Sequence, residues 1–149
     1  MNGKFIMNKL ILAITLFVSV LLLSPSASAE QKITKGDWDI HYIAFPSSFI
    51  KPETAREYNL ERSRYMAIVN ISVLDSSTKK AQNVSLTGNA KNLLGQTKQL
   101  SFKKVKEGDA IYYLAQLKHR DEENLNFTIE VQRGNRTETI KFKKKLYVD

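Results

Sequence analysis

The sequence predicts an all-β fold, an antiparallel immunoglobulin-like β-sandwich of about seven strands with one short helix or ordered loop inserted. Several short stretches alternate apolar and polar side chains, the period of a strand with one face in a core. Turn-forming residues separate these stretches, and no long stretch has the 3.6-residue period of a helix. The Cys and Trp signature of antibody domains is absent, so the likeness is to the architecture alone. A small β-barrel is the alternative fold.

The first two predicted strands are residues 36–45 and 64–74. In the first, the apolar side chains that share a face are Trp38, Ile40, Tyr42 and Ala44. The second is apolar on both faces, which favours a central strand that is covered on both sides.

Residues 46–63 lie between these strands and break the alternation. Pro52 suits the first turn of a helix, and Glu53 favours the positive end of that helix. We therefore expect a short helix or ordered loop that closes near Asn59. Irregular segments on a regular β scaffold often carry the function.

The remaining predicted strands cover residues 84–90, 100–102, 111–117, 125–131 and 137–148. Turn-forming residues lie in the connections at residues 75–80, 107–109, 121–124 and 133–136. Gly108 and Gly134 are expected to take positive φ angles, which cost a glycine little.

Residues 90–98, AKNLLGQTK, contain a glycine and two lysines, which would suit a basic anion-binding loop. A phosphate loop needs successive backbone N–H groups, and this segment has a single glycine. Residues 93–96 are therefore predicted to be a hairpin connection, with Leu93 and Leu94 capping the core and the flanking lysines on opposite limbs.

Residues 1–29 have the pattern of a cleaved secretory signal peptide. Lys4 and Lys9 precede an uncharged run, Leu10–Leu23, and Ala27-Ser28-Ala29 has the form that signal peptidase cuts. The run is shorter than the roughly 20 residues of a transmembrane helix. We predict that residues 30–149 are a single β-sandwich domain, exported to the periplasm and soluble after cleavage near Ala29.

The chain has no cysteine, which excludes disulfides, thiol nucleophiles and thiolate metal sites. Without Lys4 and Lys9 the 23 basic residues become 21 against 15 acidic residues, so the exported chain is basic. The expected anionic partners are envelope components or an acidic protein rather than nucleic acid. Lysines concentrate at Lys103, Lys104, Lys106, Lys141, Lys143, Lys144 and Lys145. They either bind anions or keep edge strands from pairing with other chains.

No motif for catalysis or a cofactor is present, and we assign neither a catalytic residue, a metal nor a cofactor. The candidate polar cluster is Asp37, Asp39 and His41, which project from one face of the first predicted strand. It supports the alternative hypothesis of a metal-dependent or acid–base enzyme. Neighbours on one strand face stand nearly 7 Å apart, so a compact site would need other segments. His119 lies in a charged turn and is expected to be exposed.

Aromatic residues in and beside the irregular segment form a candidate binding surface: Tyr42, Phe45, Phe49, Tyr58 and Tyr65. Aromatic anchors dominate binding surfaces. The alternative is that they anchor the segment by burial in the open end of the sandwich.

Four segments carry a family resemblance: HYIAFPSSFIKPETAREY at residues 41–58, NISVLD at 70–75, AKNLLGQTK at 90–98 and VKEGDAIYYLAQ at 105–116. Together they resemble a family of small exported gammaproteobacterial proteins that is catalogued as a domain of unknown function. The resemblance implies a periplasmic location but no activity. The sequence as a whole favours a non-enzymatic binding or accessory module for a protein or a cell-envelope component.

Overall fold

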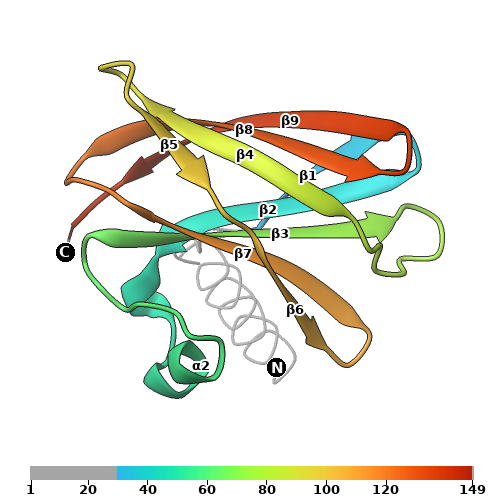
Figure 1. Cartoon of the computed structure of the whole chain (residues 1–149), viewed down its shortest axis with the longest axis horizontal. Coiled ribbons are helices and arrows are strands. Elements are labelled where there is room, and N and C mark those ends of the chain that lie inside the picture. Colours follow the sequence, from blue (N-terminus) through green and yellow to red (C-terminus); the bar gives the residue numbers. More distant parts are fainter. Residues whose placement is uncertain (1–29, 149) are drawn as a thin grey trace, which may run out of the picture.

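Nine strands form two antiparallel sheets in residues 30–148, the part of the chain that the computed structural model describes (Figure 1). They are β1 (Gln31–Lys35), β2 (Trp38–Pro46), β3 (Met66–Asp75), β4 (Ser85–Asn92), β5 (Thr97–Leu100), β6 (Lys103–Glu107), β7 (Ala110–Lys118), β8 (Glu123–Arg133) and β9 (Arg136–Leu146). The sheet orders are β1-β2-β3-β7-β6 and β5-β4-β8-β9. The predicted all-β sandwich is confirmed, and the barrel alternative is wrong because neither sheet closes on itself. The predicted signal peptide lies outside the described residues.

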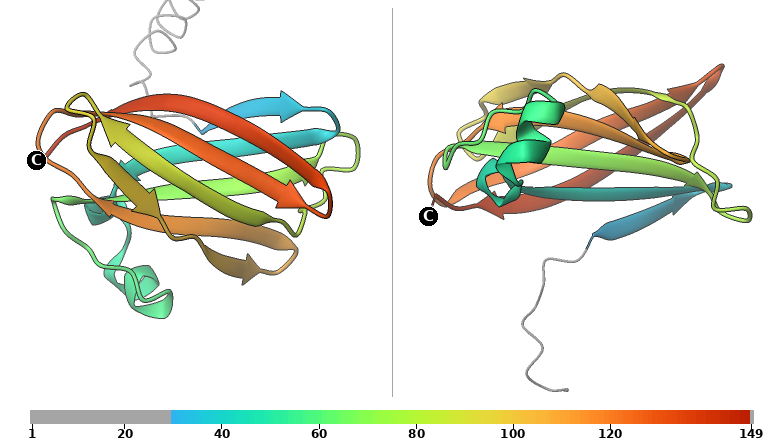
Figure 2. Two further views of the ribbon diagram at one scale, coloured as in Figure 1. Left: turned by 45° about the horizontal axis from the view of Figure 1, so that its top comes forward. Right: turned by 90° about the horizontal axis from the view of Figure 1, so that it is seen from below.

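The two sheets pack face to face around one hydrophobic core (Figure 2). Alternate residues of each strand point into it, as in β8, where the core side chains are Leu125, Phe127, Ile129 and Val131. Burial of apolar surface contributes about 25 cal/mol per Å², so this core is the main source of stability.

The strands differ from the prediction at two places. Residues 36–45 are not one strand, because Gly36, with a φ of 57°, and Asp37 form a turn between β1 and β2. The prediction missed β1 because Ile33 is the single large apolar residue in QKITK. The strand predicted at residues 100–102 is the passage from β5 in one sheet to β6 in the other.

The irregular segment between β2 and β3 contains the predicted short helix. It begins with a 3-10 turn, η1 (Ser47–Phe49), and continues with α2 (Pro52–Glu57). Pro52 lies in the first turn of α2 beside Glu53, and Asn59, with a φ of 53°, lies just after the end of this helix. The predicted helix and its closure near Asn59 are confirmed.

The end of this segment lies over the outer face of β7 and β6 in the five-stranded sheet. The side chain of Gln116 bonds both backbone groups of Glu61, at 3.0 and 2.9 Å. Lys103 Nζ donates to the Tyr58 carbonyl at 2.7 Å. This cover explains why Ile68, on the outer face of β3, is fully buried. β3 is therefore the predicted central strand, and its outer face is buried at Met66 and Ile68 and half-buried beyond them.

The connections between strands gather at two ends of the sandwich (Figures 1 and 2). We call one the loop end; its segments are residues 47–65, 93–96, 119–122 and 147–148. We call the other the turn end; its segments are residues 36–37, 76–84, 108–109 and 134–135. Within residues 30–148 no helix is long and apolar enough to span a bilayer.

Candidate binding surface at the loop end

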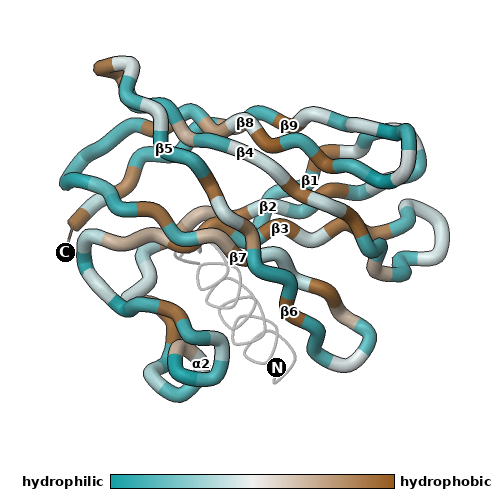
Figure 3. The backbone as a smooth tube through the Cα atoms, in the orientation of Figure 1, coloured by the Kyte–Doolittle hydropathy of each residue, from teal (hydrophilic) through white to brown (hydrophobic). Residues whose placement is uncertain are grey.

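Large apolar side chains are exposed at the loop end. Among residues 30–148, the exposed large hydrophobic residues are Phe49 (69%), Tyr65 (58%), Leu93 (76%), Leu94 (76%) and Tyr147 (48%). All five lie in loop-end segments, and Figure 3 shows the apolar tip of the β4–β5 hairpin projecting from the body. These exposed side chains make the loop end the candidate interaction site of the described residues.

The β2–β3 segment is closed at its base by two serines. Ser47 is fully buried; its hydroxyl donates to the Ser63 carbonyl at 3.1 Å and accepts from the Ser63 N–H at 2.9 Å. The Arg62 guanidinium donates to two backbone carbonyls on either side of Phe49, at 2.7 and 3.2 Å. Phe49 is therefore presented by a fixed turn and not by a loose loop.

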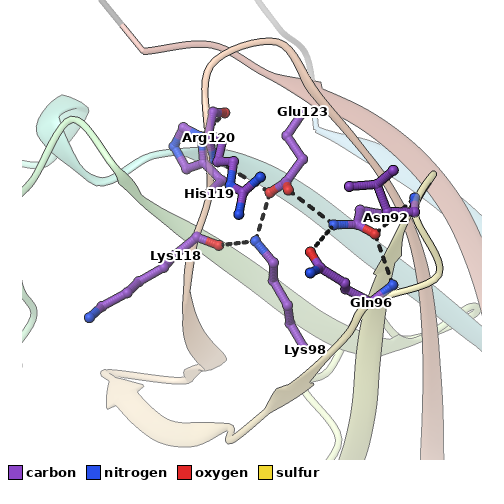
Figure 4. A network of polar contacts seen from close by, with 8 residues as sticks. Asn92, Gln96, Lys98, Lys118, His119, Arg120 and Glu123 are labelled. Atoms are coloured by element: carbon purple, nitrogen blue, oxygen red, sulfur yellow. Dashed lines mark hydrogen bonds and ion pairs between the residues drawn. The ribbon is translucent and has the colours of Figure 1, made fainter.

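The side chain of Asn92 holds the β4–β5 hairpin (Figure 4). Its Oδ1 accepts from the backbone N–H groups of Leu94 at 3.1 Å and Gln96 at 2.9 Å, and its Nδ2 donates to Gln96 Oε1 at 2.9 Å. The predicted hairpin connection is confirmed. The expectation that Leu93 and Leu94 cap the core is wrong, because the buried Asn92 side chain occupies the space under the turn.

Glu123 joins this hairpin to the β7–β8 connection (Figure 4). Its Oε2 accepts from Asn92 Nδ2 at 3.3 Å, and its Oε1 lies 2.6 Å from Lys98 Nζ. Burial alone would raise the pKa of Glu123, but the bonds from Lys98 and Asn92 outweigh burial and hold the pKa below its ordinary value. Lys98 also donates to the Lys118 carbonyl at 2.5 Å.

His119 joins the β7–β8 connection to the β2–β3 segment. Its backbone N–H donates to the Tyr65 carbonyl at 2.8 Å, and its ring Nδ1 lies 2.9 Å from the Arg120 carbonyl. The residue is buried, so the predicted exposure of His119 is wrong. Val148 N–H donates to Asp121 Oδ1 at 2.8 Å, which ties the C-terminal segment to the same connection. The four loop-end segments are therefore linked to one another by hydrogen bonds.

The five aromatic residues of the predicted binding surface do not share one environment. Those that pack or bond within the fold are Tyr42, Phe45 and Tyr58, and those that stay exposed are Phe49 and Tyr65. Tyr42 stacks on Phe142 with ring centroids 4.3 Å apart. The Tyr58 hydroxyl donates to the Glu107 carboxylate, which raises the pKa of Tyr58 to about 12. The structure thus places two of the five at the surface of the loop end.

The residues of the candidate polar cluster, Asp37, Asp39 and His41, have separate surroundings. Asp37 lies in the β1–β2 turn and pairs with Arg136, whereas Asp39 lies in β2 and pairs with Lys79 at 2.9 Å. His41 is half-buried further along β2. Within residues 30–148, no three His, Asp or Glu side chains are placed to hold a metal ion together. The three residues of the candidate polar cluster therefore do not form one metal site.

Asp39 is a structural hub of the turn end. Its Oδ1 accepts from the hydroxyls of Thr34 at 2.8 Å and Ser76 at 3.0 Å. The bonds from Lys79 and Thr34 hold the pKa of the Asp39 carboxyl well below its ordinary value. A carboxylate with its oxygens occupied in this way is a poor general base.

The lysine-rich strands β6 and β9 are edge strands of different sheets. Lys103 and Lys104 bond Tyr58 and Asn83, at 2.7 Å in both cases. The two groups of lysines therefore do not form one patch. The positions of both groups fit the hypothesis of edge protection. The β9 lysines also fit the hypothesis of anion binding.

A family model described as a domain of unknown function, DUF4426, matches residues 32–149. The chain belongs to the DUF4426 family. A DUF4426 family protein of known crystal structure from Pseudomonas aeruginosa PAO1 is 36% identical to it, with a TM-score of 0.73, over 82% of this chain and 98% of that chain. No curated protein sequence matches this DUF4426 chain.

Two structures of FetP from uropathogenic Escherichia coli have the same fold as this DUF4426 chain. One has 12% identity and a TM-score of 0.59, over 80% of this chain and 94% of that chain. The other, a copper-bound variant, has 12% identity and a TM-score of 0.58, over 79% and 95%. At this identity the likeness shows the fold alone.

Sequence reasoning missed several members of this surface: Asn92, Leu93, Leu94, Glu123 and Tyr147. One signal was present for the leucines. Two adjacent apolar residues at the tip of a hairpin cannot both reach the core, because side chains beyond the last strand pair have no facing sheet. The partnership of Asn92 and Glu123 joins positions 31 residues apart, and no local pattern reveals it.

Proposed function

We propose that this DUF4426 protein is a non-enzymatic binding module that contacts a protein or cell-envelope component through its loop end. The observation that carries the proposal is that every exposed large apolar side chain of residues 30–148 lies at that end. Phe49 and Tyr65 are the aromatic anchors, a residue class that is enriched in the buried centres of interfaces.

The hydrogen bonds within the loop end also support the proposal. Ser47, Asn92 and His119 are buried, and each bonds a backbone group of a loop-end segment. A surface that is ordered before contact loses little conformational entropy on binding, so more of the contact energy appears as affinity.

The proposed compartment is the periplasm, where the predicted signal peptide would deliver the chain. FetP, which shares the fold, was expressed in the periplasm. A periplasmic chain without cysteine is independent of the oxidising conditions there.

Photo-crosslinking in living cells tests the proposal. A photoreactive phenylalanine derivative replaces Phe49 or Tyr65, which keeps an aromatic ring at each site. The matched controls carry the same derivative at Asp109 or Asn135, exposed positions of the turn end. We expect a discrete adduct from the loop-end positions and none from the controls. The same adducts at both ends, or no adduct at the loop end together with no binding to envelope lipids, would contradict the proposed surface.

A further inference from the structure

The β4–β5 hairpin tip has features that suit contact with a lipid surface rather than with a protein pocket. Leu93 and Leu94 are adjacent and are the most exposed of the large apolar side chains in residues 30–148, at 76% each. The connection between β4 and β5, which carries both leucines, projects from the body of the sandwich (Figure 3). The bonds of Asn92 fix the backbone beneath them, so the tip is held in the exposed position.

Exposed lysines lie on the outer face of the four-stranded sheet to which the hairpin belongs. Lys141, Lys143 and Lys145 alternate along β9, so they share this face. Lys91 belongs to the same face, because both Lys91 and Lys143 pair with Asn126 of β8. The four lysines are exposed and form none of the ion pairs found in residues 30–148.

Leu93 and two of these four lysines border a common depression. Its lining includes Leu93, Asn126, Lys143 and Lys145. The residues opposite the lysines in β8 are neutral: Asn124, Asn126 and Thr128. A second depression at the tip is lined by Leu93 and Leu94 and by charged residues of both signs, Arg120, Asp121, Glu122 and Glu123. The positive flank of the tip is therefore the side toward β9.

We propose that the hairpin tip docks on an anionic lipid bilayer, with Leu93 and Leu94 in the interfacial region and the β9 lysines against the head groups. Leucines enter this region because it removes apolar surface from water, and each lysine near an anionic leaflet adds electrostatic attraction. A convex apolar tip needs no preformed pocket in a fluid bilayer. The inference rests on the proposed function, since it names the partner of one part of the loop end.

Vesicle binding by the purified protein, residues 30–149, tests the inference. We expect co-sedimentation with vesicles of phosphatidylglycerol and phosphatidylethanolamine, and little with vesicles of phosphatidylcholine. Raising the salt to about 0.5 M NaCl should release the protein, because ions screen exposed charges. The paired substitution Leu93→Gln with Leu94→Gln should weaken partitioning by about tenfold or more.

The lysines have a matched control. Lys141→Gln with Lys143→Gln should lower partitioning into anionic vesicles by about tenfold at low salt. Lys80→Gln with Lys106→Gln removes the same charge from exposed positions away from the tip and should have a much smaller effect. Equal effects of the two pairs would show attraction to net charge and would overturn the proposed lysine contact.

Insertion of the tip has its own readout, because the chain has no cysteine. An environment-sensitive dye on Leu94→Cys should shift to the blue when anionic vesicles are added, whereas the same dye on Asp109→Cys should not. Vesicle binding without this shift would overturn insertion by the tip.

The failure of this inference is distinguishable from failure of the proposed function. Absence of vesicle binding, together with a discrete protein adduct from a photoreactive group at Leu94 in cells, would make the partner a protein. The lipid inference would then be wrong and the proposed function would stand. Absence of both vesicle binding and loop-end adducts would overturn both.

Discussion

The two ends of the sandwich are both held by polar networks, but they treat large apolar side chains in opposite ways. At the turn end, Trp38 is 3% exposed and lies under the Arg136 guanidinium, 3.8 Å from the ring centroid. At the loop end, Phe49 is 69% exposed on a turn that Arg62 holds in place. Exposure at the loop end is therefore not the result of loosely held loops. This contrast is why we propose the loop end as the binding surface.

The largest expected effect is a difference in stability between variants of Trp38 and variants of Phe49. Trp38→Ala should lower the free energy of unfolding by about 3–5 kcal/mol, because it opens a cavity in the core beneath Arg136. Phe49→Ala should change it by less than about 0.5 kcal/mol, since most of that ring is already in water. Urea unfolding followed by circular dichroism measures both. Similar losses for the two variants would mean that Phe49 is part of the core.

The next effect concerns the network beneath the hairpin tip. Asn92→Ala removes a buried side chain that bonds Leu94, Gln96 and Glu123, and should cost about 1–3 kcal/mol of unfolding free energy. Asn89→Ala, in the same strand, is the matched control and should cost much less. Hydrogen exchange at the Leu94 and Gln96 amides should rise in the Asn92 variant alone. Unchanged protection there would show that Asn92 does not hold the tip.

The sequence was sufficient for the parts of the fold that depend on local patterns. Alternation predicted β8, and Pro52 with Asn59 predicted the bounds of the helical segment. β1 was missed because one apolar residue, Ile33, does not make an alternating pattern. The pairing of β1 with β2 is seen only in the folded structure.

The candidate surface was predictable only in part. Phe49 was predicted from its place in the irregular segment and Tyr65 from its place at the border of that segment. Tyr58 belongs to the fold, because its hydroxyl bonds Glu107 of β6. His119 was expected to be exposed because its neighbours in sequence are charged. Its burial depends on a bond to Tyr65, a residue more than fifty positions away.

A smaller effect on stability is expected from the charge of Asp39 at the turn end, and this effect depends on pH. The folded-state pKa of Asp39 lies below its unfolded value, so Asp39 stabilises the fold above an unfolded pKa of about 3.9. This stabilisation is lost as the pH falls from there through the folded-state pKa. Asp39→Asn should therefore lower the Tm by several degrees at neutral pH, and the difference from the unsubstituted chain should shrink near pH 2–3. A difference that does not change with pH would show that the carboxylate charge is not the stabilising feature.

The smallest effect on stability is expected at the hairpin tip. Leu93→Gln with Leu94→Gln should change the free energy of unfolding by less than about 0.5 kcal/mol, because neither side chain is part of the core. Thermal unfolding measures the change. A loss of several kcal/mol would assign the leucines to the fold and remove them from the binding surface.

Cysteine protection compares the two ends of the sandwich most directly. Single cysteines at Phe49→Cys, Leu94→Cys, Asp109→Cys and Asn135→Cys are labelled with a small maleimide in intact cells and in the purified protein. The chain has no other cysteine, so each signal has one source. We predict that the two loop-end cysteines react more slowly in cells than in the purified protein, while the two turn-end cysteines react equally in both. Equal reactivity at all four positions would contradict the loop end as the contact surface.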